Sequence, residues 1–329
     1  MIYKRLVLAA ACLTFVVVVV GAYVRLQDAG LGCPDWPGCY GHWVGVPQGA
    51  EEIERATQGY PQRPVETHKA WKEVFHRYIA GALGVLIFAI MLTAWTQRRA
   101  LRQSPWLPTA IVGLLVLQAA LGMWTVTMLL KPVIVTLHLL GGMTTLALLS
   151  WLAMRQMVFP PPPAGALYVG PWAAAGLVVV ICQITLGGWV STNYAALVCR
   201  DFPTCHGAWL PAMDFRHGFQ IARELGMTAA GTPLALDALT AIHWAHRAGA
   251  LITFSYIGAL AVALMRAPGC SRLGGGLAIL LALQVSLGIA NVLLMLPLPL
   301  AVAHNGVAAA LLVMMVVINF ALSRTGNSP

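Results

Sequence analysis

Hydrophobic and polar positions alternate along this chain on the scale of whole helices. Eight long apolar stretches recur, at about residues 6–24, 74–96, 105–129, 133–154, 171–191, 241–265, 274–296 and 299–322. Each is about as long as the roughly 20 residues that a helix needs to cross a bilayer. The pattern predicts an all-α integral membrane protein with eight transmembrane helices.

The charged residues indicate how these spans are oriented. Only 9% of the residues are charged and 59% are hydrophobic, whereas a soluble domain has roughly 25% charged residues. All eleven acids lie in or beside the loops on one side, and the segments of the other side carry nine cations and no acid, namely Lys4, Arg5, Arg98, Arg99, Arg102, Arg155, Arg266, Arg272 and Arg324. By the positive-inside rule both termini are cytoplasmic, which predicts a multi-pass protein of the plasma (inner) membrane. The net charge of +9 is an inside-facing surplus and gives no reason to expect nucleic acid as a partner.

The second half of the sequence repeats the first. Seven residues recur at an offset of 166, in the pairs Gly21/Gly187, Cys33/Cys199, Cys39/Cys205, Gly41/Gly207, Gln118/Gln284, Gly122/Gly288 and His138/His304. His76-Arg77 recurs as His246-Arg247 at an offset of 170. Self-similarity of this kind indicates a duplicated structural unit.

Each repeat has four spans, so both halves enter the membrane in the same sense. We expect two four-helix bundles related by a pseudo-twofold axis along the membrane normal. The predicted divisions are an N-terminal bundle at 1–159, a cytoplasmic Pro-rich linker at 160–170 and a C-terminal bundle at 171–329. Residues 44–70 form the most hydrophilic part of the chain and are predicted to be an external loop that could carry one surface helix.

Four histidines occupy repeat-related positions near the outer ends of the even-numbered spans. One histidine in a membrane helix is more often a hydrogen-bonded core residue than a ligand, but the repeated placement favours ligands. A zinc or copper site would need further Cys, His or carboxylate ligands at one point. Two imidazoles from facing helices are the arrangement that holds one haem iron, so the predicted metal ligands are His76, His138, His246 and His304.

The residues beside these ligands differ between the halves. Arg77 and Arg247 follow two of the histidines and could pair with haem propionates; the alternative is that both side chains reach the outer membrane interface. Three residues before His76 stands Glu73, whereas His243 stands three before His246. A poorly solvated carboxylate near an iron ligand can exchange a proton or stabilise positive charge. We therefore expect a reactive first half and an electron-transfer second half, with the role of His243 left open.

The first external loop contains two cysteines in LGCPDWPGC. Cys33 and Cys39 are six residues apart on the external side, where an oxidising compartment would allow them to pair. Two free thiols in a proline-bent loop are the alternative.

Taken together, these motifs resemble the haem A synthase family (CtaA/Cox15 type) along nearly the whole chain. The resemblance is carried by the eight spans in two repeats, by Glu-x-x-His-Arg at Glu73, His76 and Arg77, by the other three histidines and by the cysteine pair in the first external loop. It implies oxidation of the C8 methyl group of haem O to a formyl group, giving haem A. On this reading, His76 and His138 face the substrate haem, His246 and His304 ligate a permanent haem b, and Glu73 is catalytic.

The resemblance also concerns the cysteines and the partners. It implies that Cys33 and Cys39 form a redox-active or structural disulfide, and Cys199 and Cys205 match a second pair found in part of the family. Docking with a haem O synthase, exchange with an electron carrier or quinone, and a homo-oligomer are further expectations, and the loop at 206–237 has no assigned role.

Two other functions compete with this one. A non-catalytic dihaem b-type cytochrome in quinol electron transfer would use the four histidines equally well, but it gives no reason for a carboxylate in one half alone. A haem exporter or chaperone would need weak, exchangeable ligation and no fixed second haem.

Overall fold

The computed structural model describes residues 2–157 and 164–323, and in these ranges the chain is almost entirely helical. The eight predicted spans are confirmed as long apolar helices: α1 Ile2–Leu26, α3 Thr67–Thr96, α5 Trp106–Thr127, α6 Pro132–Met154, α7 Gly170–Thr192, α9 Leu236–Arg266, α10 Ser271–Leu293 and α11 Leu298–Leu322. Two of them extend beyond the apolar pattern, because α3 begins at Thr67 instead of about residue 74 and α9 at Leu236 instead of about 241. The added residues include polar side chains such as His68 and Asp237, so a search for uncharged apolar stretches leaves them out.

Prolines mark the beginnings of three spans. Pro132 is the first residue of α6, and Pro171 and Pro299 lie in the first turns of α7 and α11. Proline is favoured there because the first N–H groups of a helix have no partner within the helix, and its fixed φ suits helical geometry. These residues therefore help to set where each helix starts after its loop.

The remaining elements are short. The first external loop contains the expected surface helix, α2 Ala50–Gly59, and the others are α4 Arg98–Leu101, α8 Phe215–Gly218 and the 3₁₀ helices η1 Ala164–Val169 and η2 Ala195–Leu197. Of the predicted linker at 160–170, residues 160–163 lie outside the described ranges and 164–169 form η1. The described residues form isolated β-bridges but no strand.

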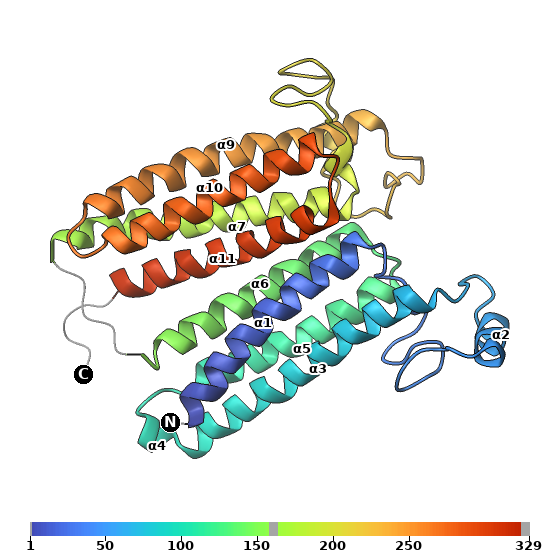
Figure 1. Cartoon of the computed structure of the whole chain (residues 1–329), viewed down its shortest axis with the longest axis horizontal. Coiled ribbons are helices and arrows are strands. Elements are labelled where there is room, and N and C mark those ends of the chain that lie inside the picture. The colour runs from blue at the N-terminus through green and yellow to red at the C-terminus, as the bar shows by residue number, and fades with distance from the viewer. Residues whose placement is uncertain (1, 158–163, 324–329) are drawn as a thin grey trace. The chain divides into compact units, whose positions relative to one another are not determined.

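The chain divides into two compact units, Met1–Thr145 and Leu146–Pro329, each built on long helices (Figure 1). In the second unit α7, α9, α10 and α11 pack around a common core. Gly176 of α7 lies against Ile257 and Leu260 of α9 and Met315 of α11, and the side-chain amide of Asn319 donates to the Ala173 carbonyl at 3.0 Å. Small residues allow such close helix packing in membranes.

The first unit is held together in a similar way. Gly84 of α3 faces Leu115 of α5, and Gly142 of α6 faces Val18 of α1. The apolar side chains that point away from each bundle stay exposed, such as Val85 at 74% and Leu251 at 68%. Large apolar surfaces of this kind suit contact with lipid.

Candidate active site

A glycine on a neighbouring helix faces each of the four predicted ligand histidines. A Cβ atom built on the glycine would lie 3.0–3.3 Å from the Cε1 atom of the imidazole in all four places. The pairs are Gly21 with His76, Gly122 with His138, Gly187 with His246 and Gly288 with His304. The glycines leave space in which the imidazole packs against the backbone of the next helix, so any larger residue would displace the ring.

Glutamine side chains contact three of these imidazoles. The Gln183 amide donates to His246 Nδ1 and to the His246 carbonyl, both at 3.1 Å. With its nitrogen facing the histidine, the Gln118 amide makes the same two contacts to His138 at 3.0 and 3.1 Å. Gln284 lies 3.3 Å from Nε2 of His304. These contacts restrict the rotation of the three rings.

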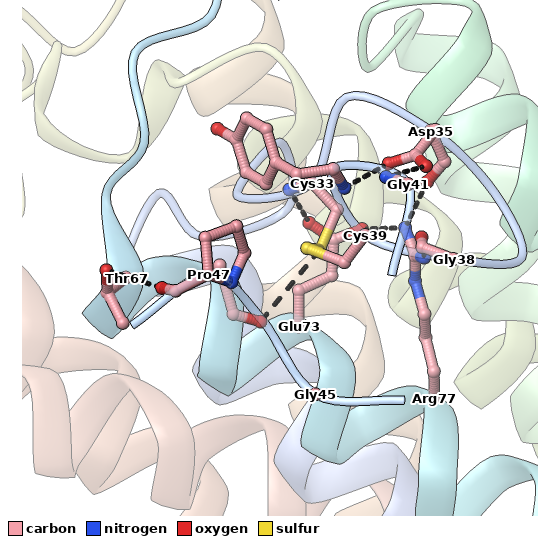
Figure 2. The surroundings of a disulfide bond; sticks show 12 residues. Cys33, Asp35, Gly38, Cys39, Gly41, Gly45, Pro47, Thr67, Glu73 and Arg77 are labelled. Atoms are coloured by element: carbon pink, nitrogen blue, oxygen red, sulfur yellow. Dashed lines mark hydrogen bonds and ion pairs between the residues drawn. A yellow bond between two sulfur atoms is a disulfide. The ribbon is translucent and has the colours of Figure 1, made fainter. Parts of the chain in front are cut away.

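Glu73 is buried on α3, with only 5% of its surface exposed. Its Oε1 atom accepts a hydrogen bond from Arg77 at 2.5 Å, and its Oε2 atom accepts one from the backbone N–H of Cys33 at 3.0 Å (Figure 2). A buried carboxylate is costly unless it is paired and hydrogen-bonded, and here both oxygens have partners. The first external loop and its own helix therefore fix Glu73 one turn before His76.

Arg77 also clasps the first external loop. Its guanidinium donates to the carbonyl oxygens of Asp35, Pro37 and Gly38 at 3.1, 3.2 and 2.5 Å. Figure 2 shows the side chain rising from α3 to this loop beside the Cys33–Cys39 disulfide. In the structure the guanidinium thus contacts protein carbonyls and Glu73, and its pairing with a propionate stays a prediction.

In the second unit Arg247 makes matching contacts to the external loop, but His243 stands in the place of Glu73. Arg247 donates to the carbonyl oxygens of Cys199 and Thr204, both at 2.7 Å, and its Nε donates to Nε2 of His243 at 3.1 Å. His243 is 4% exposed, and its Nδ1 lies 2.9 Å from the Ala195 carbonyl. His243 is therefore fully engaged with protein groups and takes the structural place of the carboxylate.

The loops held by the arginines have matching cores. Disulfides join Cys33 to Cys39 and Cys199 to Cys205. Asp201 accepts hydrogen bonds from the Thr204 hydroxyl and from the N–H groups of Gly207 and His206, which hold the pKa of its carboxyl below the ordinary value. Asp35 accepts from the N–H groups of Tyr40 and Gly41 in the same way.

These loops turn at Gly41 and Gly207, with φ values of +78° and +75°, a region that glycine adopts without strain. Because the turn, the aspartate and the disulfide recur together, each loop is a rigid cap at the end of its unit. Each cap reaches the residue three before a ligand histidine, through the Cys33 N–H in one unit and through Arg247 in the other.

The loop at 206–237, which had no assigned role, contains a buried arginine. Arg223 is 2% exposed, donates to Met227 and Asn193, and lies over the Trp189 ring at 5.7 Å. Burial lowers its pKa. It ties the loop to the end of α7 and so stabilises the outer end of the second unit.

The donor set of each unit suits a haem. Among the described residues no group of three or more His, Cys, Asp or Glu side chains could bind a bare metal ion, whereas a porphyrin supplies four nitrogens and needs only axial ligands from the protein. Within each unit the two histidines are close enough to interact electrostatically, His76 with His138 and His246 with His304. Buried polar atoms at both sites have no partner in the described structure, including Nδ1 of His76 and Nδ1 of His304. The residues therefore fit bis-histidine haem binding.

Sequence reasoning missed the partners of the histidines. The repeat identifies Gln118, Gly122, Gln284 and Gly288 as paired positions, but it does not place them beside the histidines. The four-residue spacing between each glutamine and glycine was the available signal, because residues i and i+4 lie on one helix face. Contact with a histidine on another helix required the fold.

Comparisons with known proteins agree with these features. The model of the COX15-CtaA family, described as cytochrome oxidase assembly protein, matches residues 4–316. A haem A synthase of Shewanella oneidensis is 44% identical over 96% of this chain and 95% of its own length. Haem A synthases of Caulobacter sp. (strain K31) and Bacillus licheniformis are 30% and 27% identical, over 92% and 88% of this chain and 90% and 85% of theirs. These matches confirm the resemblance drawn from the motifs, and the chain belongs to the COX15-CtaA family of cytochrome oxidase assembly proteins.

Proposed function

We propose that this protein is a haem A synthase, an oxidoreductase that converts haem O to haem A by oxidising the C8 methyl group to a formyl group. The observation that carries the proposal is the buried carboxylate of Glu73, held at both oxygens one turn before His76. The relatives given above bear the same name. The substrate haem is then bound in the first unit, between His76 and His138.

Glu73 is the group proposed to act on the reacting methyl carbon. Its carboxylate can accept a proton or stabilise positive charge that develops there. Arg77 and the Cys33 N–H orient both oxygens, so little reorganisation is needed when the substrate binds. Burial excludes water from the carboxylate and strengthens its interaction with a developing charge.

The second unit is proposed to hold haem b between His246 and His304. A bis-histidine haem b supplies a one-electron carrier when bound. The protein's part is to hold the ligand rings, through Gly187 and Gly288 and through Gln183 and Gln284. His243 adds no carboxylate there, which fits a site that keeps its haem unchanged.

The finer points of assembly belong to the same proposal. The charge pattern supports both termini in the cytoplasm and the caps outside, in a plasma (inner) membrane. The two repeats support bundles at 1–159 and 171–329 related by a pseudo-twofold axis. An electron carrier or quinone would take the electrons, and a haem O synthase and a second copy of this chain are proposed partners.

Pigment analysis of the purified protein tests the proposal. The protein is produced in cells that also make haem O, and the extracted haems are separated and quantified. We expect haem b together with haem O or haem A. Two equivalents of haem b and no other haem would contradict the proposal and favour a dihaem cytochrome.

A further inference from the structure

The glutamine and glycine that face a ligand histidine form a unit of sequence on their helix. In three helices the glutamine stands four residues before the glycine, at 118 and 122 in α5, at 183 and 187 in α7, and at 284 and 288 in α10. Residues i and i+4 share a helix face. Each of these helices therefore presents one amide and one gap to a single imidazole.

The fourth helix departs from this pattern. In α1 the glycine is present at Gly21, where an added Cβ would lie 3.0 Å from Cε1 of His76, so Gly21 faces its histidine as its counterparts do. The position four residues before it is Val17. Valine offers no hydrogen bond, and Nδ1 of His76 is buried without a hydrogen-bond partner in the described structure; Nδ1 of His304 also has none, but Gln284 contacts that ring at Nε2. His76 is thus the one ligand of the four whose ring no glutamine contacts.

An amide beside a ligand histidine affects how firmly the ring is held. Iron ligation through Nε2 leaves a proton on Nδ1, which then needs an acceptor. The oxygen of Gln183 is buried without a partner, and an amide carries both a donor and an acceptor. Turning the Gln183 amide brings its oxygen to Nδ1 of His246 and gives up the contact to the His246 carbonyl. Valine at residue 17 can do neither.

We propose that Val17 makes His76 the exchangeable ligand of the first unit, whereas Gln118 and Gln183 hold His138 and His246 in place. The inference rests on the proposed function, which puts a substrate haem between His76 and His138. A substrate haem must enter and its product must leave, while a resident haem b must stay. A weakly held His76 allows the haem to leave, and a firmly held His138 keeps the haem oriented while it is bound.

Cyanide binding to the oxidised, haem-loaded protein tests this inference, because cyanide binds iron only when an axial ligand has left. In the native protein we expect cyanide to bind the haem of the first unit and not haem b. In the Val17→Gln variant the rate should fall by about fivefold, the effect of one net hydrogen bond. Gln183→Leu should have the opposite effect at the second unit and make haem b accessible to cyanide.

Val16→Gln is the matched control. Val16 is the neighbour of Val17 in the sequence, but its side chain is 47% exposed. The control variant adds the same amide in the same turn and should leave the cyanide rate unchanged. If Val17→Gln contains the native amount of haem and binds cyanide at the native rate, the inference is wrong. It is also wrong if haem b in Gln183→Leu still does not bind cyanide. If the proposed function is wrong, the result is different. The protein then carries no haem in the first unit, and His76→Ala removes no haem signal.

Discussion

In both units an arginine joins the external loop to a buried side chain, but that side chain differs. In the first, Arg77 binds Glu73 and three loop carbonyls; in the second, Arg247 binds His243 and two loop carbonyls. The loops match in disulfide, aspartate and turn, so the scaffold is common to both. Beneath these loops, a neutral donor–acceptor in one unit replaces the carboxylate of the other.

This difference separates holding a haem from changing it. Bis-histidine ligation is available in both units, whereas a buried anion beside the ligand is available in one. Because a buried ion needs several partners, the carboxylate requires the loop N–H and the arginine together. His243 is satisfied by one carbonyl and one guanidinium N–H, so it fits the same place without charge.

The largest expected effect comes from removing a ligand of the second unit. His246→Ala or His304→Ala should weaken haem b binding by more than about 100-fold, since loss of even an outer-shell partner costs about 10–100-fold. Optical spectra of the purified variants measure this loss. His217→Ala, in an external loop, should keep the full spectrum, and a complete low-spin haem b spectrum in His246→Ala would contradict the ligand assignment.

The two disulfides should be alike in stability and unlike in function. Each closes a loop with a sequence separation of six, so loss of either should cost about 2 kcal/mol in the loop-entropy account. Thermal unfolding of Cys33→Ser/Cys39→Ser and Cys199→Ser/Cys205→Ser measures this cost.

Only loss of the Cys33–Cys39 disulfide should also reduce haem A formation, because the Cys33 N–H donates to Glu73. If both double variants lost activity equally at the same stability, this contact would have no catalytic importance.

The glycines that face the histidines should be equivalent in the two units. In Gly21→Ala and Gly187→Ala the added Cβ would meet an imidazole carbon at 3.0 Å. Each should weaken haem binding by about 1 kcal/mol, the lower end for overpacking. Titration of haem into the haem-free protein measures this change. Gly113→Ala and Gly275→Ala, which meet nothing within 4 Å, are the controls and should bind normally.

The smallest effect concerns the cap of the second unit. The pKa of Asp201 lies below the ordinary value, because the Thr204 hydroxyl and the N–H groups of Gly207 and His206 stabilise its charged form. A lowered folded pKa contributes stability above the unfolded value and loses it as the pH falls through the folded pKa. Asp201→Asn should therefore unfold at a slightly lower temperature than the native protein at pH 7, and the difference between the two unfolding temperatures should shrink below about pH 4. A difference that widens on acidification would contradict this account.

The sequence predicted the spans because crossing a bilayer requires a length of apolar residues that no other fold demands. Duplication placed four histidines at matching positions, and the structure sets a glycine of a neighbouring helix against each; their role as ligands stays a prediction. The sequence could not predict what binds Glu73, since the Cys33 N–H lies 40 residues away and reaches it through the fold of the loop. It also could not predict the loop carbonyls that Arg77 and Arg247 contact, because only the folded cap presents them. The pairing of these arginines with propionates stays a prediction.

The pigment content of Glu73→Gln tests the central claim most directly. The variant keeps the shape of the side chain and one of its two acceptor atoms, and it removes the charge. We expect native amounts of both haems, with haem O unconverted and haem A formation reduced by at least about 100-fold. His243→Gln, the matched change in the second unit, should still make haem A. Normal haem A formation by Glu73→Gln would contradict the claim that this carboxylate makes the first unit the reactive one.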